Sequence, residues 1–394
     1  MDIPGDPPFI ELSDCADVAA QNARLAQFRQ RHWIARSARG YEILTYDMCE
    51  RVLRDPAWIQ GVSENLKKYG VRVPGGAQGR TLSRTEGGEH ERLRRIVQPW
   101  FAPRRLDELR ARTADLAARL VDAAGSGRCD FHRDIARRIP PRVFCWMVGA
   151  DEGDADRIGA WSESAIKAFD AQPEEFAEIG AAIAELARFV GELVERKRRA
   201  PGDDLISHLL GATRDGTLTE RDVGSLALEM LGASSDNTAH TASMTMYLLC
   251  RNPDQYAALA ADRTLVPGAI EESMRILPRV RALFDINPAP AEIGGIDFPA
   301  MSSVYLQFAS ANRDPAVFED PDRFDVTRRP ARPHLNFGLG RHVCLGAGLA
   351  RMELQELLRV VLDRWRSVEL TAEPRIRLLD DMAVHEMPVA MRRH

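Results

Sequence analysis

The sequence predicts a mainly α-helical protein with small β regions. Apolar residues recur at helical spacing through most of the chain, and short alternating β-prone runs occur in only a few places. The spacing predicts helices over 89–100, 105–123, 131–148, 154–199, 219–251 and 267–277, and a last long helix ending near Trp365. The alternation predicts strands over 41–46, 281–286, 291–296 and 303–308, and two or three short strands at the end of the chain.

The N-terminal part combines a strand, a short helix and a long loop. The strand over 41–46 is followed by a helix over 47–53, which we expect to end before Asp55 because a proline follows that residue. Residues 57–85 are rich in glycine and polar side chains and have weak periodicity, which predicts a long loop. Loops of this length are usually functional or mobile.

The longest predicted helix begins after a capping box. Thr219 and Asp222 have the spacing with which a cap hydroxyl and a carboxylate satisfy each other's backbone N–H groups. The helix should continue to Arg251, a length of roughly 48 Å at 1.5 Å per residue. Its centre, residues 232–238, is rich in small and polar side chains that favour helices poorly. A weak centre inside a long helix is a candidate functional element, and a polar kink without function is the alternative.

Composition and charge exclude several classes of protein. The chain has 394 residues, of which 45% are hydrophobic and 28% charged, a globular composition. The net charge of −5 argues against nucleic-acid binding. No apolar run approaches the length of a membrane span, and the acidic, proline-rich N-terminus is unlike a signal peptide, so we expect a cytoplasmic protein without membrane contact. None of the six cysteines forms a CxxC pair, which argues against zinc clusters and disulfides.

One cysteine lies in a glycine-rich segment just before the last long helix. Four glycines surround Cys344, and glycine lets a backbone approach a flat ligand closely and adopt positive φ. Backbone N–H groups and a helix N-terminus would stabilise a thiolate there, as a metal ligand requires. The alternative is a glycine-rich turn around a buried cysteine.

The segment over 337–346 resembles the haem-ligand loop of cytochrome P450, FGxGxHxCxG, at every fixed position. The resemblance implies that Cys344 is the axial thiolate of haem b (iron protoporphyrin IX) and that Phe337, Gly338 and Gly346 surround the cofactor. It also implies the P450 fold, a triangular haem-thiolate prism. Because its motifs extend over much of the chain, we expect residues 1–394 to form a single domain.

Two further segments are similar to the same family. Glu272 and Arg275 match its ExxR motif, in which a carboxylate and a guanidinium pair on one helical face. Residues 311–324 resemble the meander that precedes the haem loop, and Arg323 would complete a network with the ExxR pair. The order and spacing of the three motifs agree with the family, and we interpret the trio as structural.

Several cations are placed to bind the haem propionates. His90 and Arg94 lie at i, i+4 on a predicted helix and match the family's HxxxR. His342 precedes the ligand cysteine by two residues. Arg281 matches the arginine that reaches a propionate, with Arg279 as its rival. For each residue singly, the alternative is a solvated charge.

The centre of the long helix matches the family's oxygen-activation motif with two departures. Residues 233–238 align so that Asp236 is the acid that relays protons from solvent. Ser234 replaces the usual glycine and Asn237 the usual threonine, whose hydroxyl shuttles protons better than an amide. A one-residue shift would place Thr238 in the alcohol position. We therefore take all three of Asp236, Asn237 and Thr238 as candidate catalytic residues.

Family topology also suggests which residues surround the substrate. Most of these side chains are apolar, so we expect an apolar small-molecule substrate. The candidates are Ile59, Val62, Ala233, Leu283, Phe284 and His385. His385 would give a polar contact, or it is simply a surface histidine.

The resemblance implies an oxidoreductase, a P450 monooxygenase. It would use O2 to hydroxylate its substrate, and we expect that substrate to belong to natural-product metabolism. Ferredoxin and ferredoxin reductase would supply electrons, because the sequence carries no flavin or iron–sulfur module. The departure at Asn237 favours a first alternative, oxidative coupling or another non-hydroxylating reaction. A second alternative is a non-catalytic haem-binding sensor.

Overall fold

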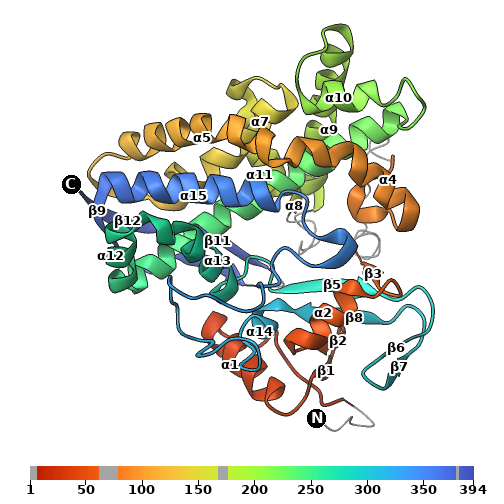
Figure 1. The fold of residues 1–394 in the computed structure, drawn as a ribbon, viewed down its shortest axis with the longest axis vertical. Helices are drawn as coiled ribbons and strands as arrows, with labels where there is room; N and C mark the ends of the chain where they lie inside the picture. Colours follow the sequence, from red (N-terminus) through yellow and green to blue (C-terminus); the bar gives the residue numbers. More distant parts are fainter. Residues whose placement is uncertain (1–6, 62–78, 167–175, 379–380) are drawn as a thin grey trace. The chain divides into compact units, whose positions relative to one another are not determined.

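The computed structural model describes residues 7–61, 79–166, 176–378 and 381–394. Its contacts divide the chain into two compact units. The first comprises residues 1–62, 244–344 and 373–385, and the second comprises residues 63–243, 345–372 and 386–394. Helices dominate and the sheets are small (Figure 1), which confirms the predicted fold class. Among the described helices, none combines the length and apolar character that a bilayer crossing requires.

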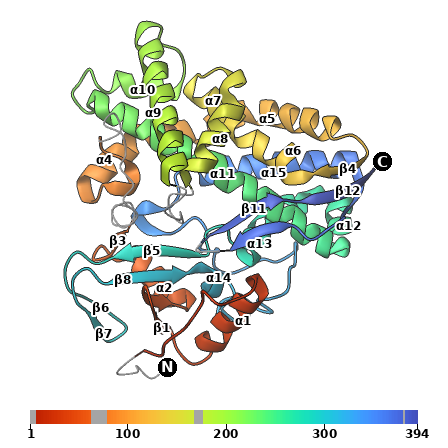
Figure 2. The same ribbon diagram turned by 180° about the vertical axis from the view of Figure 1, so that it is seen from behind.

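A five-stranded sheet with the order β1-β2-β8-β5-β3 organises the first unit. Its strands are β1 (Ile34–Ser37), β2 (Gly40–Ile43), β8 (Ser303–Gln307), β5 (Ala282–Ile286) and β3 (Ile59–Gln60). β2 runs parallel to β8, and the other neighbours are antiparallel. Figure 2 shows β5 and β8 lying side by side. The strands predicted over 281–286 and 303–308 are confirmed to within one residue.

The single strand predicted over 291–296 is wrong, because the chain turns back within it. β6 (Ala291–Ile293) and β7 (Ile296–Phe298) form an antiparallel hairpin instead. Gly294 and Gly295 make the two-residue turn with φ of +58° and +82°. Two consecutive positive φ values suit the twist of a tight hairpin, and glycine adopts them without strain.

The first unit also contains helices and a cluster of buried aromatic residues. The helices are α1 (Val18–Arg29), α2 (Tyr46–Arg54), α12 (Pro253–Ala261), α13 (Val266–Ile276) and α14 (Phe308–Ala311). α2 confirms the helix predicted over 47–53. An apolar cluster of this unit includes Trp33, Trp58, Phe298, Phe308 and Phe318. A further strand pair joins β10 (Arg375–Leu378) to β11 (Met382–Glu386).

The second unit is mostly helical. Its helices include α4 (Gly87–Val97), α5 (Pro103–Ala123), α6 (Phe131–Asp134), α7 (Ile139–Val148), α8 (Ala155–Ile166), α9 (Phe176–Arg199), α10 (Leu205–Gly211) and α15 (Ala347–Arg364). α15 packs along α5, as Figure 1 shows for the blue and orange helices. A small sheet has the order β4 (Gly127–Asp130), β12 (Pro388–Arg393) and β9 (Trp365–Leu370).

One of the long helices predicted for this unit is interrupted. The helix predicted over 131–148 divides into α6, a short 3-10 turn and α7. Pro140 and Pro141 lie in the first turn of α7, where a missing N–H costs nothing, but they could not continue a preceding helix. α7 ends at Gly149, whose φ of +68° forms a left-handed cap. In the helix predicted over 154–199, the described residues are confirmed as helical in α8 and α9, and residues 167–175 lie outside the described part of the chain.

The long helix α11 (Glu220–Arg251) confirms the predicted start and end. Thr219 and Asp222 cap it reciprocally, with N···O distances of 2.8 Å and 3.2 Å. The centre over 232–238 is continuous α-helix, although the hydroxyls of two serines there donate to a carbonyl one turn earlier. Residues up to 243 belong to the second unit and later ones to the first.

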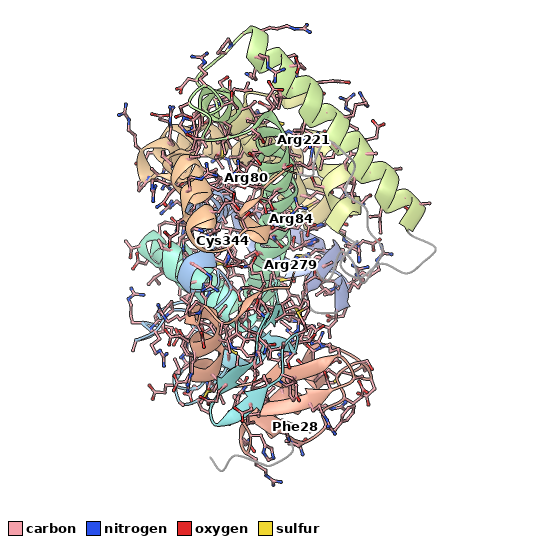
Figure 3. The ribbon with its side chains drawn as sticks, turned by 90° about the vertical axis from the view of Figure 1, so that its right-hand side faces the viewer. Phe28, Arg80, Arg84, Arg221, Arg279 and Cys344 are labelled. Atoms are coloured by element: carbon pink, nitrogen blue, oxygen red, sulfur yellow. The ribbon has the colours of Figure 1, made fainter. Side chains whose placement is uncertain are left out.

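The described end of the predicted 57–85 loop is attached to the start of α11. Backbone N–H groups of Gly79 and Arg80 donate to the side chains of Ser225 and Asp222, each at 2.8 Å. The guanidinium of Arg80, labelled in Figure 3, also bonds Asp222. A Cβ on Gly79 would lie 2.4 Å from the carbonyl oxygen of Arg221, so only glycine fits this approach.

Candidate active site

The loop around Cys344 is fixed by backbone hydrogen bonds and glycine turns. The N–H of Cys344 donates to the carbonyl of Phe337 at 2.8 Å. Gly338 and Gly340 have φ of +64° and +70°. A Cβ on Gly340 would lie 2.5 Å from the carbonyl oxygen of Leu53, so this position requires glycine for both its φ and its neighbour. The geometry confirms a rigid loop, which ends at Gly346, the N-cap of α15.

The side chain of Cys344, labelled in Figure 3, is exposed, whereas Cys49 and Cys145 are buried. Burial raises the pKa of the Cys145 thiol to about 12, and burial likewise raises that of Cys129 to about 12. Those thiols are therefore neutral packing groups at physiological pH. A thiol presented on a rigid, glycine-flanked loop before a helix N-terminus fits an axial haem ligand, and Cys344 meets these conditions.

The ExxR pair forms a buried network within the first unit. Arg275 is 1% exposed and holds both carboxylate oxygens of Glu272, with Nε–Oε2 at 2.7 Å and Nη2–Oε1 at 2.8 Å. Its Nη1 also donates to the carbonyls of Asn312 and Pro321, at 2.9 Å and 2.7 Å. The network therefore fixes α13 against the irregular segment that leads to the cysteine loop.

The third member of this network is Arg328, so the prediction of Arg323 is wrong. Nε of Arg328 donates to Oε1 of Glu272 at 2.9 Å. The side chain of Arg323 is 64% exposed and lies 3.8 Å from Asp325. Its backbone carbonyl, however, accepts hydrogen bonds from both Arg275 and Arg328. The meander thus contributes the backbone of one arginine and the side chain of another.

The two arginines considered for a propionate have different surroundings. Arg281 is 1% exposed, and its guanidinium donates to the side-chain amides of Gln21 and Asn22 on α1, each at 2.6 Å. Those bonds hold Arg281 against α1. Arg279 pairs with the carboxylate of Asp381 at 2.5 Å. Which of the two arginines binds a propionate stays a prediction, and substitution of each in turn separates them.

The other predicted propionate ligands lie on two different units. His342 is half-buried at the end of a 3-10 turn, Gly340–His342, beside the cysteine in the first unit. His90 and Arg94 lie on α4 of the second unit, where His90 is 1% exposed and Arg94 half-buried. Their convergence on one cofactor stays a prediction.

Asp236 is held on the buried side of α11. Nε2 of His240, one turn later, lies 2.8 Å from Oδ1 of Asp236, and each side chain is 5% exposed. Asn237 and Thr238 are half-buried and Ala233 is exposed. The acid and the residues of the alcohol position thus face different environments. Sequence reasoning missed His240, although an Asp–His pair at i, i+4 was a usable signal.

The substrate candidates of the first unit gather on neighbouring strands. Ile59 of β3 pairs with Ile286 of β5, and both Leu283 and Phe284 of β5 are half-buried. Adjacent residues of a strand point to opposite faces. Leu283 contacts the apolar cluster while the ring of Phe284 stacks on Tyr305, with centroids 5.0 Å apart. One pocket can therefore include only one of the two.

Another substrate candidate, His385, comes from β11. It is half-buried near the end of this strand, after three buried residues. Val62 lies outside the described residues.

Comparison with known proteins gives the family. The model of the cytochrome P450 family matches residues 165–389. The chain is 36% identical to 6-deoxyerythronolide B hydroxylase of Saccharopolyspora erythraea over 80% of this chain and 76% of that protein. It is 34% identical to mycinamicin IV hydroxylase/epoxidase of Micromonospora griseorubida over 88% of each.

A solved structure, the cytochrome P450 enzyme CxnD for C–S bond formation in chuangxinmycin biosynthesis, has a TM-score of 0.87 and 27% identity, covering 100% of this chain and 99% of that one. The two curated relatives are thus named as a hydroxylase and a hydroxylase/epoxidase, and the solved structure of a cytochrome P450 enzyme has the same fold as this chain. Since the family model spans more than half of the sequence and the hydroxylases match most of it, the chain belongs to the cytochrome P450 family and is a monooxygenase of the oxidoreductase class.

Proposed function

We propose that this protein hydroxylates an apolar small molecule in natural-product metabolism, using O2 and electrons from ferredoxin and ferredoxin reductase. The observation that carries the proposal is the hydrogen-bonded, glycine-rich loop that places Cys344 just before the N-terminus of α15. The names of its relatives, among them a 6-deoxyerythronolide B hydroxylase, support hydroxylation as the reaction.

The proposed cofactor is haem b. Cys344 would hold its iron, while Arg279 and His342 of the first unit and His90 and Arg94 of the second would neutralise its propionates. When bound, the group supplies the activation of dioxygen. That residues 1–394 form a single domain around this cofactor stays a prediction.

Within the chain, Asp236 is the residue that holds and moves protons. Its carboxylate lies on the face of α11 that includes His240. Asn237, half-buried beside it, offers amide N–H donors and a carbonyl acceptor at the place where the family has a hydroxyl. Asn237 would orient oxygen or a water molecule, and Asp236 would provide the proton.

The substrate site would be mostly apolar. Ile59 and one residue of the Leu283–Phe284 pair would contribute from the sheet of the first unit, and Ala233 from α11. A screen of apolar small molecules for a shift in the haem spin state would identify the substrate class. A binder should produce a saturable shift, and a polar relative of the same size provides the control.

Ligation by Cys344 has a direct spectroscopic test. The reduced protein with carbon monoxide should show the red-shifted Soret band of a thiolate complex, and Cys344→Ala should abolish it. Cys145→Ala is the matched control, because this buried thiol should have no part in ligation. Retention of the band in Cys344→Ala would show that the ligand is wrong.

A second reaction, oxidative coupling, is favoured by Asn237 and by the likeness to a C–S bond-forming enzyme. Turnover under isotopically labelled O2 separates the two reactions. Hydroxylation places one labelled oxygen atom in the product, whereas coupling gives an unlabelled product. Asn237→Thr should raise the labelled fraction if the amide is what favours coupling.

A further inference from the structure

A small pocket in the second unit connects an exposed, charged surface with the buried carboxylate of Asp236. It is lined by His132, Arg137, Pro141, Ala155, Asp156, Gly159, Ala160, Glu163, Ser235, Asp236 and Ala239. Its space for water-sized molecules is about 30 Å³, which holds about two waters. The pocket therefore has room for a short chain of water molecules.

The two ends of the pocket differ in exposure and charge. At the outer end, the side chains of Arg137, Asp156 and Glu163 are 47%, 63% and 41% exposed, and the first and last of them lie 3.7 Å apart. At the inner end, Asp236 and His132 are 6% and 4% exposed. Solvent therefore contacts titratable side chains at the mouth of the pocket, and the carboxylate of Asp236 lies at its base.

Two stacked histidines lie beside that carboxylate, and one of them, His240, contacts it. The rings of His132 and His240 are 4.8 Å apart and nearly parallel, with an interplanar angle of 6°. Nε2 of His240 lies 2.8 Å from Oδ1 of Asp236, and Nδ1 of His132 lies 2.9 Å from Oγ of Ser243. Each buried imidazole is therefore fixed by a hydrogen bond and by the face of the other ring.

The position of His132 is itself determined by the fold. It lies in α6, whose N-cap Asp130 accepts the N–H of Arg133 at 3.0 Å and that of Met387 at 3.2 Å. The helix turn is thus bound to the neighbouring strand. A displaced α6 would remove the ring against which His240 stacks, and Asp236 would lose its fixed partner.

We propose that His240, clamped by His132, is a positioning residue that holds the carboxylate of Asp236 at the base of this pocket, and that the pocket is the route by which solvent protons reach it. The proposal rests on the proposed function. In each transfer a pocket water gives one proton to a carboxylate oxygen of Asp236, so that one O–H bond breaks and another forms. The water then regains a proton from solvent at the mouth.

The first test removes the hydrogen bond to Asp236. His240→Leu should lower the rate of product formation about tenfold and raise the solvent deuterium isotope effect, because proton delivery becomes slower. His240→Gln should restore most of the rate, since its amide N–H can again donate to the carboxylate. Substrate affinity and the carbon monoxide band should be unchanged in both. If His240→Leu and His240→Gln lose the same fraction of the rate, or if the isotope effect is unchanged, His240 is not a positioning residue.

The second test blocks the route. Ala160→Phe at the mouth should also slow turnover and raise the isotope effect, while Ala184→Phe, the same exchange at an exposed position of α9, should not. If both variants behave like the parent protein, protons reach Asp236 by another path and the pocket is not the route.

The third test does not depend on turnover. In ¹⁵N-histidine-labelled holoprotein, Asp236→Asn should shift the Nε2 signal of His240 and leave that of His208, whose Nε2 lies 2.9 Å from the carbonyl of Ile96, in place. No shift would refute the contact itself. Loss of the carbon monoxide band in the parent protein would instead refute the proposed function, so the two failures are distinguishable.

Discussion

Arg328 and Arg323 offer a matched pair of substitutions that tests the network around Glu272. Replacing either arginine with alanine removes one positive charge from the same segment. Arg328 is 12% exposed and donates to Glu272 at 2.9 Å, whereas the side chain of Arg323 is 64% exposed with a carboxylate no nearer than 3.8 Å. The structure therefore predicts very different costs for two arginines five positions apart.

The expected loss follows from the contacts. Arg328→Ala removes one charged hydrogen bond to a buried carboxylate and bonds to three backbone carbonyls at the edge of the network. Glu272 keeps Arg275, so the loss should be less than the roughly 3–5 kcal/mol for breaking a buried pair completely. We expect the free energy of unfolding to fall by about 2–3 kcal/mol. Arg323→Ala should cost less than about 0.5 kcal/mol, as exposed pairs do.

Urea titration followed by circular dichroism measures both variants under the same conditions. Arg328→Ala should unfold at a clearly lower urea concentration than the parent protein, and Arg323→Ala at nearly the same concentration. The double variant should resemble Arg328→Ala. If Arg323→Ala loses as much stability as Arg328→Ala, the side chain of Arg323 belongs to the network and the assignment made here is wrong.

Three further outcomes are expected. Burial raises the pKa of Glu353 well above 4.5. The unfolded chain therefore loses this proton at a lower pH than the folded chain, so the free energy of unfolding should fall as pH rises above 4.5. Glu353→Gln should remove this decline in urea midpoints measured between pH 5 and 8. Gly340→Ala should prevent haem loading. Gly338→Ala, whose Cβ would meet no atom within 4 Å, should lower the free energy of unfolding by only about 1–2 kcal/mol because of its positive φ. Haem absorbance of the two purified proteins compares them. Arg279→Ala should speed haem transfer to an acceptor protein more than Arg281→Ala, and the reverse order would restore Arg281 as the propionate ligand.

Features encoded by short stretches of sequence could be predicted. The ends of α11 follow from a capping box and a terminal Asn-Pro, and the glycines around Cys344 have the positive φ that their loop requires. The ExxR spacing places Glu272 and Arg275 on one helical turn, where they pair. In each case the residues that decide the structure lie within a few positions of one another.

Features that depend on contacts between distant parts of the sequence could not be predicted. The cation that completes the network around Glu272 is chosen by the path of an irregular segment, and the spacing of motifs does not determine that path. Arg281 turned out to bond α1, more than 250 positions earlier in the chain. The ring that stacks on His240 belongs to His132 of α6, and no residue near His132 in the sequence indicates this stacking.

The assembly of each unit from separate stretches of sequence also has a consequence for synthesis of the chain. Each unit consists of three stretches, and the last stretch of each lies after residue 372. Contacts between residues far apart in the sequence can form only after the intervening chain has been made. Neither unit can therefore complete its packing until the ribosome has made almost the whole chain, so a chain that is released early would leave both units unfinished.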